Sequence, residues 1–168
     1  MVEKVLLAYA SRSGSTAEIA EKITEVLRGK GISVDLMPVD QAKELDEYGA
    51  VILGSTVYYG RWRKEAVKFL KEQEESLKAR KVWFFSSGPT GEGDPVDLLS
   101  GWTFPPLQQE IADRIQPRGT AVFHGRMDES NLNFIERWLL KRMDAAMGDF
   151  RDWDQITGWA EGIAQDLG

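Results

Sequence analysis

The sequence has no cysteine, and this absence excludes several kinds of site at once. A chain without thiols forms no disulfide and has no thiolate nucleophile, iron–sulfur cluster or Cys-ligated zinc. Histidine is almost as scarce, because His124 is the only one. One imidazole disfavours both a His-based metal centre and a Ser-His-Asp triad. We therefore assign no catalytic side chain and no metal-binding residue from the sequence.

Long apolar runs are also missing, and no stretch approaches the roughly 18 residues that a membrane-spanning helix needs. The first residues lead straight into a strand-like segment without the shape of a signal peptide, so we expect a cytoplasmic protein. The formal net charge of −6 argues against nucleic acid as a partner and, more weakly, against an anionic membrane. An excess of acid is compatible with steering toward basic protein partners.

Short apolar runs alternate with segments of helical periodicity along the chain. Strands are expected at 5–9, 32–36, 50–54, 81–86 and 120–123. Helices are expected at 15–28, 64–79, 107–115, 131–147 and 153–167, with a helical turn at 41–45. This alternation predicts an α/β fold: a three-layer, doubly wound, parallel five-stranded sheet in the order 2-1-3-4-5, with an extra helix after the fifth strand. No linker or repeat interrupts residues 1–168, so we expect a single domain.

The loop after the first strand is rich in hydroxyl groups and reads Ser11, Arg12, Ser13, Gly14, Ser15, Thr16. In a doubly wound sheet the ligand lies beyond the carboxyl ends of the strands, next to this loop. Unpaired amides at the start of the following helix attract a phosphate, and Arg12 offsets part of its charge. Ser15 and Glu18 also match a capping box, which is the alternative explanation for those two residues. The loop has neither a dinucleotide-binding nor a P-loop glycine pattern, so it predicts a mononucleotide.

Two further loops are expected beside the same ligand. The loop after the third strand contains Thr56, Val57, Tyr58, Tyr59 and Gly60, followed by Trp62. Its aromatic side chains suit a planar ring, and the alternative is that an aromatic here covers the start of the next helix. The loop after the fourth strand contains Ser87, Gly88, Pro89, Thr90 and Gly91. Its amides suit the polar rim of such a ring, and the alternative is an ordinary mobile loop.

Together, these three loops resemble those of the flavodoxin family. Residues 11–16 match the hydroxyl-rich phosphate loop of that family, with Ser13 in place of the usual threonine. The resemblance implies one FMN, with its phosphate at the first loop and its ring between the other two. Residues 52–60 and the stretch from 137 to 153 are similar, more closely, to flavodoxin-type, menaquinone-dependent protoporphyrinogen dehydrogenases. The loop after the fourth strand is basic in that branch, whereas Glu92, Asp94 and Asp97 make it acidic here, which disfavours a propionate-bearing porphyrinogen.

The function expected from these features is that of an FMN-binding electron-transfer protein that cycles its flavin between redox partner proteins. One alternative is a flavin-dependent oxidoreductase that acts on a quinone or a porphyrinogen. Another alternative is a non-redox module that binds a phosphate ligand and serves in protein interaction.

The helix expected at 131–147 has an apolar stripe formed by Ile135, Trp138, Leu139, Met143, Ala146 and Met147. The stripe is either a docking surface for a partner protein, a quinone or a membrane interface, or a face packed on the edge of the sheet. His124 is expected to be a partly buried, hydrogen-bonded residue rather than a flavin contact. The last helix is expected to contribute core residues: Trp153, Ile156, Ala160, Ile163 and Leu167.

Overall fold

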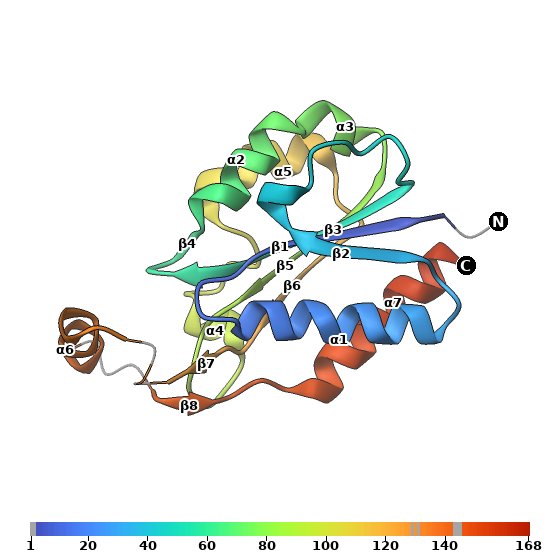
Figure 1. Ribbon diagram of the computed structural model, residues 1–168. Coiled ribbons are helices and arrows are strands. Elements are labelled where there is room, and N and C mark those ends of the chain that lie inside the picture. The colour runs from blue at the N-terminus through green and yellow to red at the C-terminus, as the bar shows by residue number, and fades with distance from the viewer. Residues whose placement is uncertain (1–2, 129, 131, 143–145) are drawn as a thin grey trace.

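The computed structural model describes residues 3–128, 130, 132–142 and 146–168, and it is built around a parallel sheet (Figure 1). The long strands are β1 (Val5–Ala10), β2 (Val34–Pro38), β3 (Ala50–Tyr58), β5 (Lys81–Ser87) and β6 (Gly119–Phe123). They lie in the order β2-β1-β3-β5-β6, and the short β4 (Arg61–Trp62) pairs with the end of β3 in the antiparallel sense. The predicted order 2-1-3-4-5 is confirmed, because β5 and β6 are the fourth and fifth long strands.

Helices cover both faces of the sheet, as Figure 1 shows. One face carries α1 (Ser15–Gly29) and α7 (Trp153–Leu167), and the other carries α2 (Lys64–Glu72), α3 (Glu74–Lys78) and α5 (Gln109–Ile115). The shorter helices are η1 (Val39–Gln41), α4 (Pro95–Leu98) and η2 (Pro106–Gln108). The single helix predicted at 64–79 is thus two helices that meet at Gln73, and the turn predicted at 41–45 lies slightly earlier, as η1.

The two cores on either side of the sheet explain why the first apolar run does not alternate with polar residues. Val5 and Leu7 pack toward α1 and α7, whereas Leu6 and Ala8 pack into the cluster beneath α2 and α5. A strand buried on both faces needs apolar side chains at every position. The last helix buries the predicted residues except one, because Trp153 is 36% exposed. Trp153 is the first residue of α7, and the Arg151 guanidinium lies over its ring at 4.7 Å.

A second, smaller structure follows β6. The strands β7 (Arg126–Met127) and β8 (Gly148–Asp149) form an antiparallel ribbon, and α6 (Phe134–Arg142) lies between them in the sequence. The helix predicted at 131–147 is therefore shorter than expected, and Met143 lies outside the described residues. In Figure 1, α6 stands apart from the three layers, so the expectation that it packs on the edge of the sheet is wrong.

The helices that the structure describes include none with the length and apolar composition to cross a lipid bilayer.

A polar contact far from the site ties the edge strand to the loop before β3 and leads to a testable pH dependence. The buried Tyr48 donates a hydrogen bond to Asp35 Oδ2 at 2.6 Å, and Lys4 Nζ lies 3.0 Å from the same oxygen. The hydrogen bond from Tyr48 is the main cause that lowers the pKa of Asp35. We expect Tyr48→Phe to lower the free energy of unfolding by about 1 kcal/mol at pH 7, since the carboxylate is partly exposed.

The sign of the pH effect follows from the lowered pKa of Asp35. This contribution is complete above the unfolded-state pKa of about 4 and is lost as the pH falls below it. Urea unfolding of both proteins at pH 7 and near pH 3 measures this, and the difference between them should shrink in acid. A difference that stays constant would show that the ionised carboxylate is not the partner of Tyr48.

Candidate functional site

The loop between β1 and α1 folds into a tight turn that leaves several backbone amides without a hydrogen bond among the described residues. Gly14 has φ 90°, a left-handed conformation that glycine adopts without strain, and it precedes the first residue of α1. Ser11 Oγ accepts hydrogen bonds from the amides of Gly14 at 3.1 Å and Ala17 at 3.4 Å. Within the described residues, the amides of Ser13, Ser15 and Thr16 donate no hydrogen bond. They are therefore available to an anion at the positive end of the helix.

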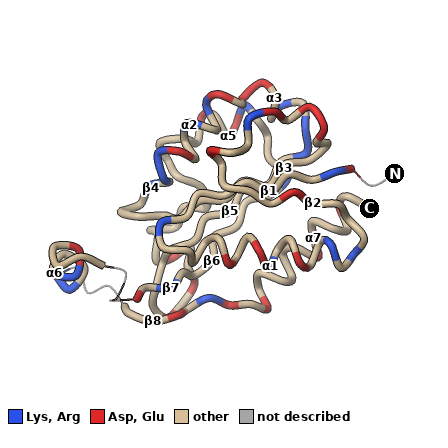
Figure 2. Tube along the Cα trace, in the orientation of Figure 1, with Lys and Arg blue, Asp and Glu red and all other residues tan. Residues whose placement is uncertain are grey.

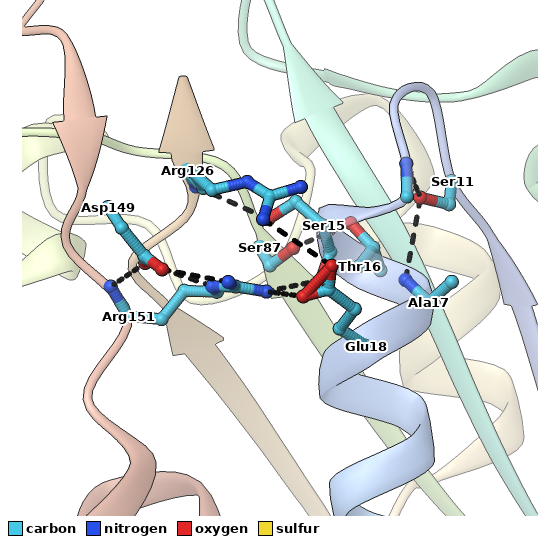
Figure 3. A network of polar contacts seen from close by, with 10 residues as sticks. Ser11, Ser15, Thr16, Ala17, Glu18, Ser87, Arg126, Asp149 and Arg151 are labelled. Atoms are coloured by element: carbon cyan, nitrogen blue, oxygen red, sulfur yellow. Dashed lines mark hydrogen bonds and ion pairs between the residues drawn. The ribbon is translucent and has the colours of Figure 1, made fainter. Parts of the chain in front are cut away.

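The capping box that was the alternative explanation for Ser15 and Glu18 is not formed, because α1 has no side-chain cap. Ser15 Oγ instead accepts from the amide of Arg126 at 3.2 Å, and Glu18 pairs with Arg151 at 2.9 Å and Arg126 at 3.4 Å (Figure 3). Asp149 completes the network, and its hydrogen bond from Arg151 lowers the pKa of its carboxyl group. These residues therefore attach the start of α1 to the ribbon of β7 and β8.

Thr16 joins the three loops that the sequence placed at the site. Its side chain is fully buried, and its Oγ1 lies 2.7 Å from both Thr56 Oγ1 and Ser87 Oγ. Thr56 lies near the end of β3 and Ser87 is the last residue of β5, so three elements meet in one cluster of hydroxyl groups. The amide of Arg12 donates to Thr56 Oγ1 as well, at 3.3 Å. The juxtaposition of these loops is as predicted.

The loop after β3 is a tight hairpin that presents tyrosine side chains. Tyr59 and Gly60 have φ 53° and 71°, and Tyr58 pairs with Arg61 across the turn, which is the pattern of a two-residue type I′ hairpin. The Arg12 guanidinium lies over the Tyr58 ring at 4.1 Å, whereas Tyr59 is 49% exposed. The Tyr58 hydroxyl is buried without a hydrogen-bond partner among the described residues, and burial raises its pKa.

Trp62 does not join these tyrosines, so the expectation that it contacts the ring is wrong. It is 4% exposed and donates from Nε1 to Ser86 Oγ at 2.7 Å. Its ring packs against Phe84 and Phe104 in the core beneath α2 and α5.

The loop after β5 lies close to two other backbone segments. Gly88 has φ 153°, and a Cβ there would lie 2.5 Å from the carbonyl oxygen of Val57. A Cβ on Gly125 would lie 2.7 Å from the Cα of Gly88. His124 faces the carbonyl oxygens of Pro89 and Gly93 through its two ring nitrogens, at 3.2 and 2.8 Å. His124 is therefore the buried, hydrogen-bonded residue that was predicted, and it holds the loop in place.

Two adjoining cavities lie between these loops. One has a volume of about 340 Å³, lies at the start of α1 and is lined by Arg12, Ser13 and Thr56. The other has a volume of about 440 Å³, lies at the hairpin and is lined by the segments 57–60 and 88–91. Both cavities share Val57, Tyr58, Gly88 and Met127, so they meet at one point. Ser11, Gly14, Ser15, Thr16 and Ser87 line neither cavity. The hydroxyl groups of the four hydroxyl residues among them hold the loops in place through the hydrogen bonds described above.

The sequence did not reveal that the segment after β6 covers this site. Arg126, Leu132 and Glu136 line the cavity at α1, and Leu140 and Ala146 line the one at the hairpin. Glu136 forms an ion pair with Arg12, which links α6 to the loop between β1 and α1. The apolar excess of α6 was visible in the sequence, but of the predicted stripe only Ala146 lines a cavity within the described residues, and Leu132, Glu136 and Leu140 lie outside that stripe.

The residues at the site determine which chemistry it can support. Arg12 and Arg126 place two cations at the cavity beside α1, opposed by Asp128 and Glu136. In the described part of the chain, no group of three or more His, Asp or Glu residues is placed to share a metal ion. The two cavities thus combine paired charges at the α1 end with tyrosine and other apolar side chains at the hairpin end.

A family model described as a flavodoxin domain matches residues 6–154. This chain belongs to the flavodoxin family. The flavodoxin fold also appears in solved structures similar to this chain. A flavodoxin from the domain Archaea is 18% identical, with a TM-score of 0.62 and 98% of both chains covered. Flavodoxin 1 from Bacillus cereus is 15% identical, with a TM-score of 0.63 and 98% and 99% of the two chains covered.

Among flavodoxin-family relatives of known activity, the chain is similar to an enzyme. It is 23% identical over 172 aligned residues to the protoporphyrinogen IX dehydrogenase [quinone] of Escherichia coli strain K12. The similarity covers 96% of this chain and 94% of the relative. Residues 52–60 and 137–153 already showed a similarity to the protoporphyrinogen dehydrogenases in the sequence alone. The alignment extends that similarity over nearly the whole of both chains.

Proposed function

We propose that this flavodoxin-family chain binds one FMN non-covalently and uses it to transfer electrons between redox partner proteins. The observation that carries the proposal is the pair of adjoining cavities that share Val57, Tyr58, Gly88 and Met127. One end offers free amides and guanidinium groups, and the other offers a tyrosine hairpin opposite a glycine-rich loop. FMN has the same layout, with a phosphate dianion at one end and a planar ring at the other.

A buried hydroxyl group that has no hydrogen-bond partner in the described part of the chain is a second observation that fits FMN. The Tyr58 hydroxyl is buried without a partner among the described residues and belongs to the residue that joins the two cavities. A buried hydroxyl group of this kind is costly unless a ligand or water satisfies it. The amides of Ser13, Ser15 and Thr16 would hold the phosphate, together with Arg12. The ring would lie between the segments 58–60 and 88–91.

FMN, when bound, supplies the redox chemistry by accepting or donating electrons. The protein's own residues bind and orient it and limit its contact with water. Leu140 and Ala146 of the segment after β6 line the ring end of the site and reduce its exposure to water there. The described residues include no acid–base pair at the hairpin cavity, so we assign no side chain a proton-transfer role.

A second candidate is a flavin-dependent oxidoreductase that acts on a quinone or a porphyrinogen, and the E. coli relative favours it. The apolar residues Leu98, Leu99 and Leu140 line the ring end of the site and suit a lipophilic acceptor. The exposed Glu92, Asp94 and Asp97 just beyond the loop disfavour a porphyrinogen with its propionates. Turnover of protoporphyrinogen with a menaquinone analogue, measured beside reduction by a flavodoxin reductase, separates this candidate from the electron carrier.

The proposal predicts that the chain binds FMN about 100-fold or more tightly than riboflavin, because riboflavin lacks the phosphate. Quenching of flavin fluorescence during titration of the flavin-free protein measures both dissociation constants. Arg12→Gln should weaken FMN binding about tenfold and leave riboflavin binding unchanged, since a charge-assisted hydrogen bond is worth about 1.5–3 kcal/mol and Glu136 already takes up part of it.

Lys22→Gln is the matched control for Arg12→Gln. It removes one positive charge from the exposed side of α1, where Lys22 pairs with Glu25 at 3.5 Å, and it should change neither constant. Equal affinity for FMN and riboflavin would contradict the assigned phosphate end. A protein that binds neither flavin would favour the non-redox alternative, a module for another phosphate ligand.

A further inference from the structure

The outer face of α6 is apolar, which is unusual for a helix at the surface of a protein. Phe134, Ile135, Trp138 and Leu139 are 80%, 66%, 51% and 37% exposed. They lie at spacings of one, three and four residues and form a continuous stripe along the helix. Scattered apolar side chains are normal on a protein surface, but a contiguous patch of this kind marks a contact surface.

The opposite face of α6 attaches it to the rest of the protein and so fixes which face is free. Glu136 and Leu140 are four residues apart and therefore lie on one side of the helix. Glu136 pairs with Arg12 of the phosphate loop, and Leu140 is 4% exposed. Glu136 also closes the first turn of α6 by accepting from the amide of Asn133 at 3.1 Å. The side of α6 with Glu136 and Leu140 therefore attaches the helix to the rest of the protein, and the apolar stripe points outward.

The charges on the free face are all of one sign. Arg137, Lys141 and Arg142 are exposed, and the only carboxylate within residues 134–142, all of which the structure describes, is the inward Glu136. The Arg142 guanidinium lies over the ring of Trp138 at 4.9 Å. Figure 2 shows these basic positions on α6, at a distance from the acidic segments of α1 and α3. The chain as a whole has a net charge of −6, so α6 is a local exception.

We propose that the outer face of α6 binds the surface of a lipid bilayer that contains anionic phospholipids. A short helix with Trp, Phe and Leu on one face and Lys and Arg beside them is suited to the boundary between headgroups and acyl chains. Trp138 with Arg142 above its ring provides an apolar body and a charged tip, which such a boundary accommodates. The net negative charge of the chain led us to expect that an anionic membrane is disfavoured. That expectation applies to the acidic rest of the domain and not to α6.

The shape of the surface favours a bilayer over a protein partner. The stripe lies on a helix that protrudes from the domain in Figure 1, and none of its four apolar residues lines either site cavity. A convex helix inserts into a bilayer without a preformed groove, whereas a protein partner would need one. The acidic body would be repelled by anionic headgroups, which leaves α6 as the contact and orients the molecule.

Membrane binding through α6 would also place the cofactor site at the lipid surface, and this consequence rests on the proposed function. Leu140 on the inner side of α6 lines the hairpin cavity, so the helix has one face toward the lipid and one toward the site. If the second candidate function holds, a lipid-soluble electron acceptor such as a quinone would then reach the site from the bilayer. Binding to lipid itself does not depend on FMN.

The test is co-flotation of the FMN-loaded protein with vesicles. We expect it to float with vesicles of phosphatidylcholine and phosphatidylglycerol but not with phosphatidylcholine alone, and we expect high salt to release it. The double variant Phe134→Ser, Trp138→Ser should weaken binding at least tenfold. Replacing Arg137, Lys141 and Arg142 with Gln should do the same, because each basic residue contributes to attraction by anionic lipid. Leu107→Ser, at a 72% exposed position on η2, is the matched control and should bind like the wild type.

Several outcomes would overturn the proposal. One is that the wild type does not float with anionic vesicles at all. Another is that the double variant floats as well as the wild type, or that the Leu107→Ser variant loses as much vesicle binding as the double variant. A dimer in size-exclusion chromatography that the double variant dissociates would show that a second copy covers the stripe instead. FMN titration of the double variant should match the wild type, since neither residue lines a cavity, so failure of lipid binding is separate from failure of the proposed cofactor.

Discussion

Thr16→Val is expected to weaken FMN binding about 100-fold and to lower the free energy of unfolding by about 2 kcal/mol. Valine has nearly the shape of threonine, so the substitution removes a hydroxyl group without opening a cavity. The lost group lies 2.7 Å from Thr56 Oγ1 and from Ser87 Oγ, which join β3 and β5 to the start of α1. The Ser87 hydroxyl would be left without its partner, at a cost of about 1–3 kcal/mol, whereas Thr56 Oγ1 keeps its hydrogen bonds with the Arg12 amide and the Ala10 carbonyl oxygen. Flavin titration and urea unfolding measure the two effects.

Thr24→Val is the matched control for this prediction. Thr24 lies on the same helix and is 2% exposed, and its hydroxyl has no hydrogen-bond partner among the described residues. Removal of that hydroxyl should leave FMN affinity unchanged and should not reduce the free energy of unfolding. If Thr24→Val weakened FMN binding as much as Thr16→Val, the effect would come from α1 as a whole and not from the hydroxyl cluster.

The sequence was sufficient for the sheet and for the positions of the three loops. Runs such as Val5–Ala10 are apolar at consecutive positions because both faces are buried, and parallel strands end at the same edge of the sheet. Residues at or just beyond the carboxyl ends of β1, β3 and β5 must therefore come together, and Thr16, Thr56 and Ser87 do so. Topology alone determines this part of the site.

The sequence was not sufficient where a residue has a choice of partners. Ser15 and Glu18 have the spacing of a capping box, yet they bond to Arg126 and Arg151 more than a hundred residues away. Such a side chain can bond either to a nearby backbone group of its own helix or to a charged residue far along the chain. The spacing of residues within one helix does not reveal the distant residue. The same limit applies to Trp62, whose indole N–H reaches Ser86 in the core instead of facing the ligand.

Helix α6 shows a second limit. Helical periodicity groups residues by face, but it does not say which face is buried. The sequence left two alternatives for the apolar stripe, a docking surface or a face packed on the sheet, and in the structure the side with Glu136 and Leu140 faces the protein. The counter-charge for the partly buried Glu136 comes from Arg12, which lies 124 residues earlier in the chain.

Gly88→Ala is expected to lower the free energy of unfolding by about 3 kcal/mol and to weaken FMN binding at least 100-fold. The added Cβ would lie 2.5 Å from the carbonyl oxygen of Val57, and a backbone atom cannot move aside as a flexible side chain does. The loop after β5 must therefore shift away from β3. Because Gly88 lines both cavities, this shift changes the junction that the phosphate end and the ring end share.

Gly158→Ala gives the opposite sign and is the control for Gly88→Ala. Gly158 lies within α7, and a Cβ there would meet no atom within 4 Å, so alanine should raise the free energy of unfolding by about 0.5–1 kcal/mol without affecting FMN. Gly125→Ala should resemble Gly88→Ala, since its Cβ would lie 2.7 Å from the Cα of Gly88. Urea unfolding and flavin titration of the three variants therefore test one geometric claim, that β3, β5 and β6 end so close together that only backbone fits between them. A Gly88→Ala protein with wild-type stability and FMN affinity would disprove it.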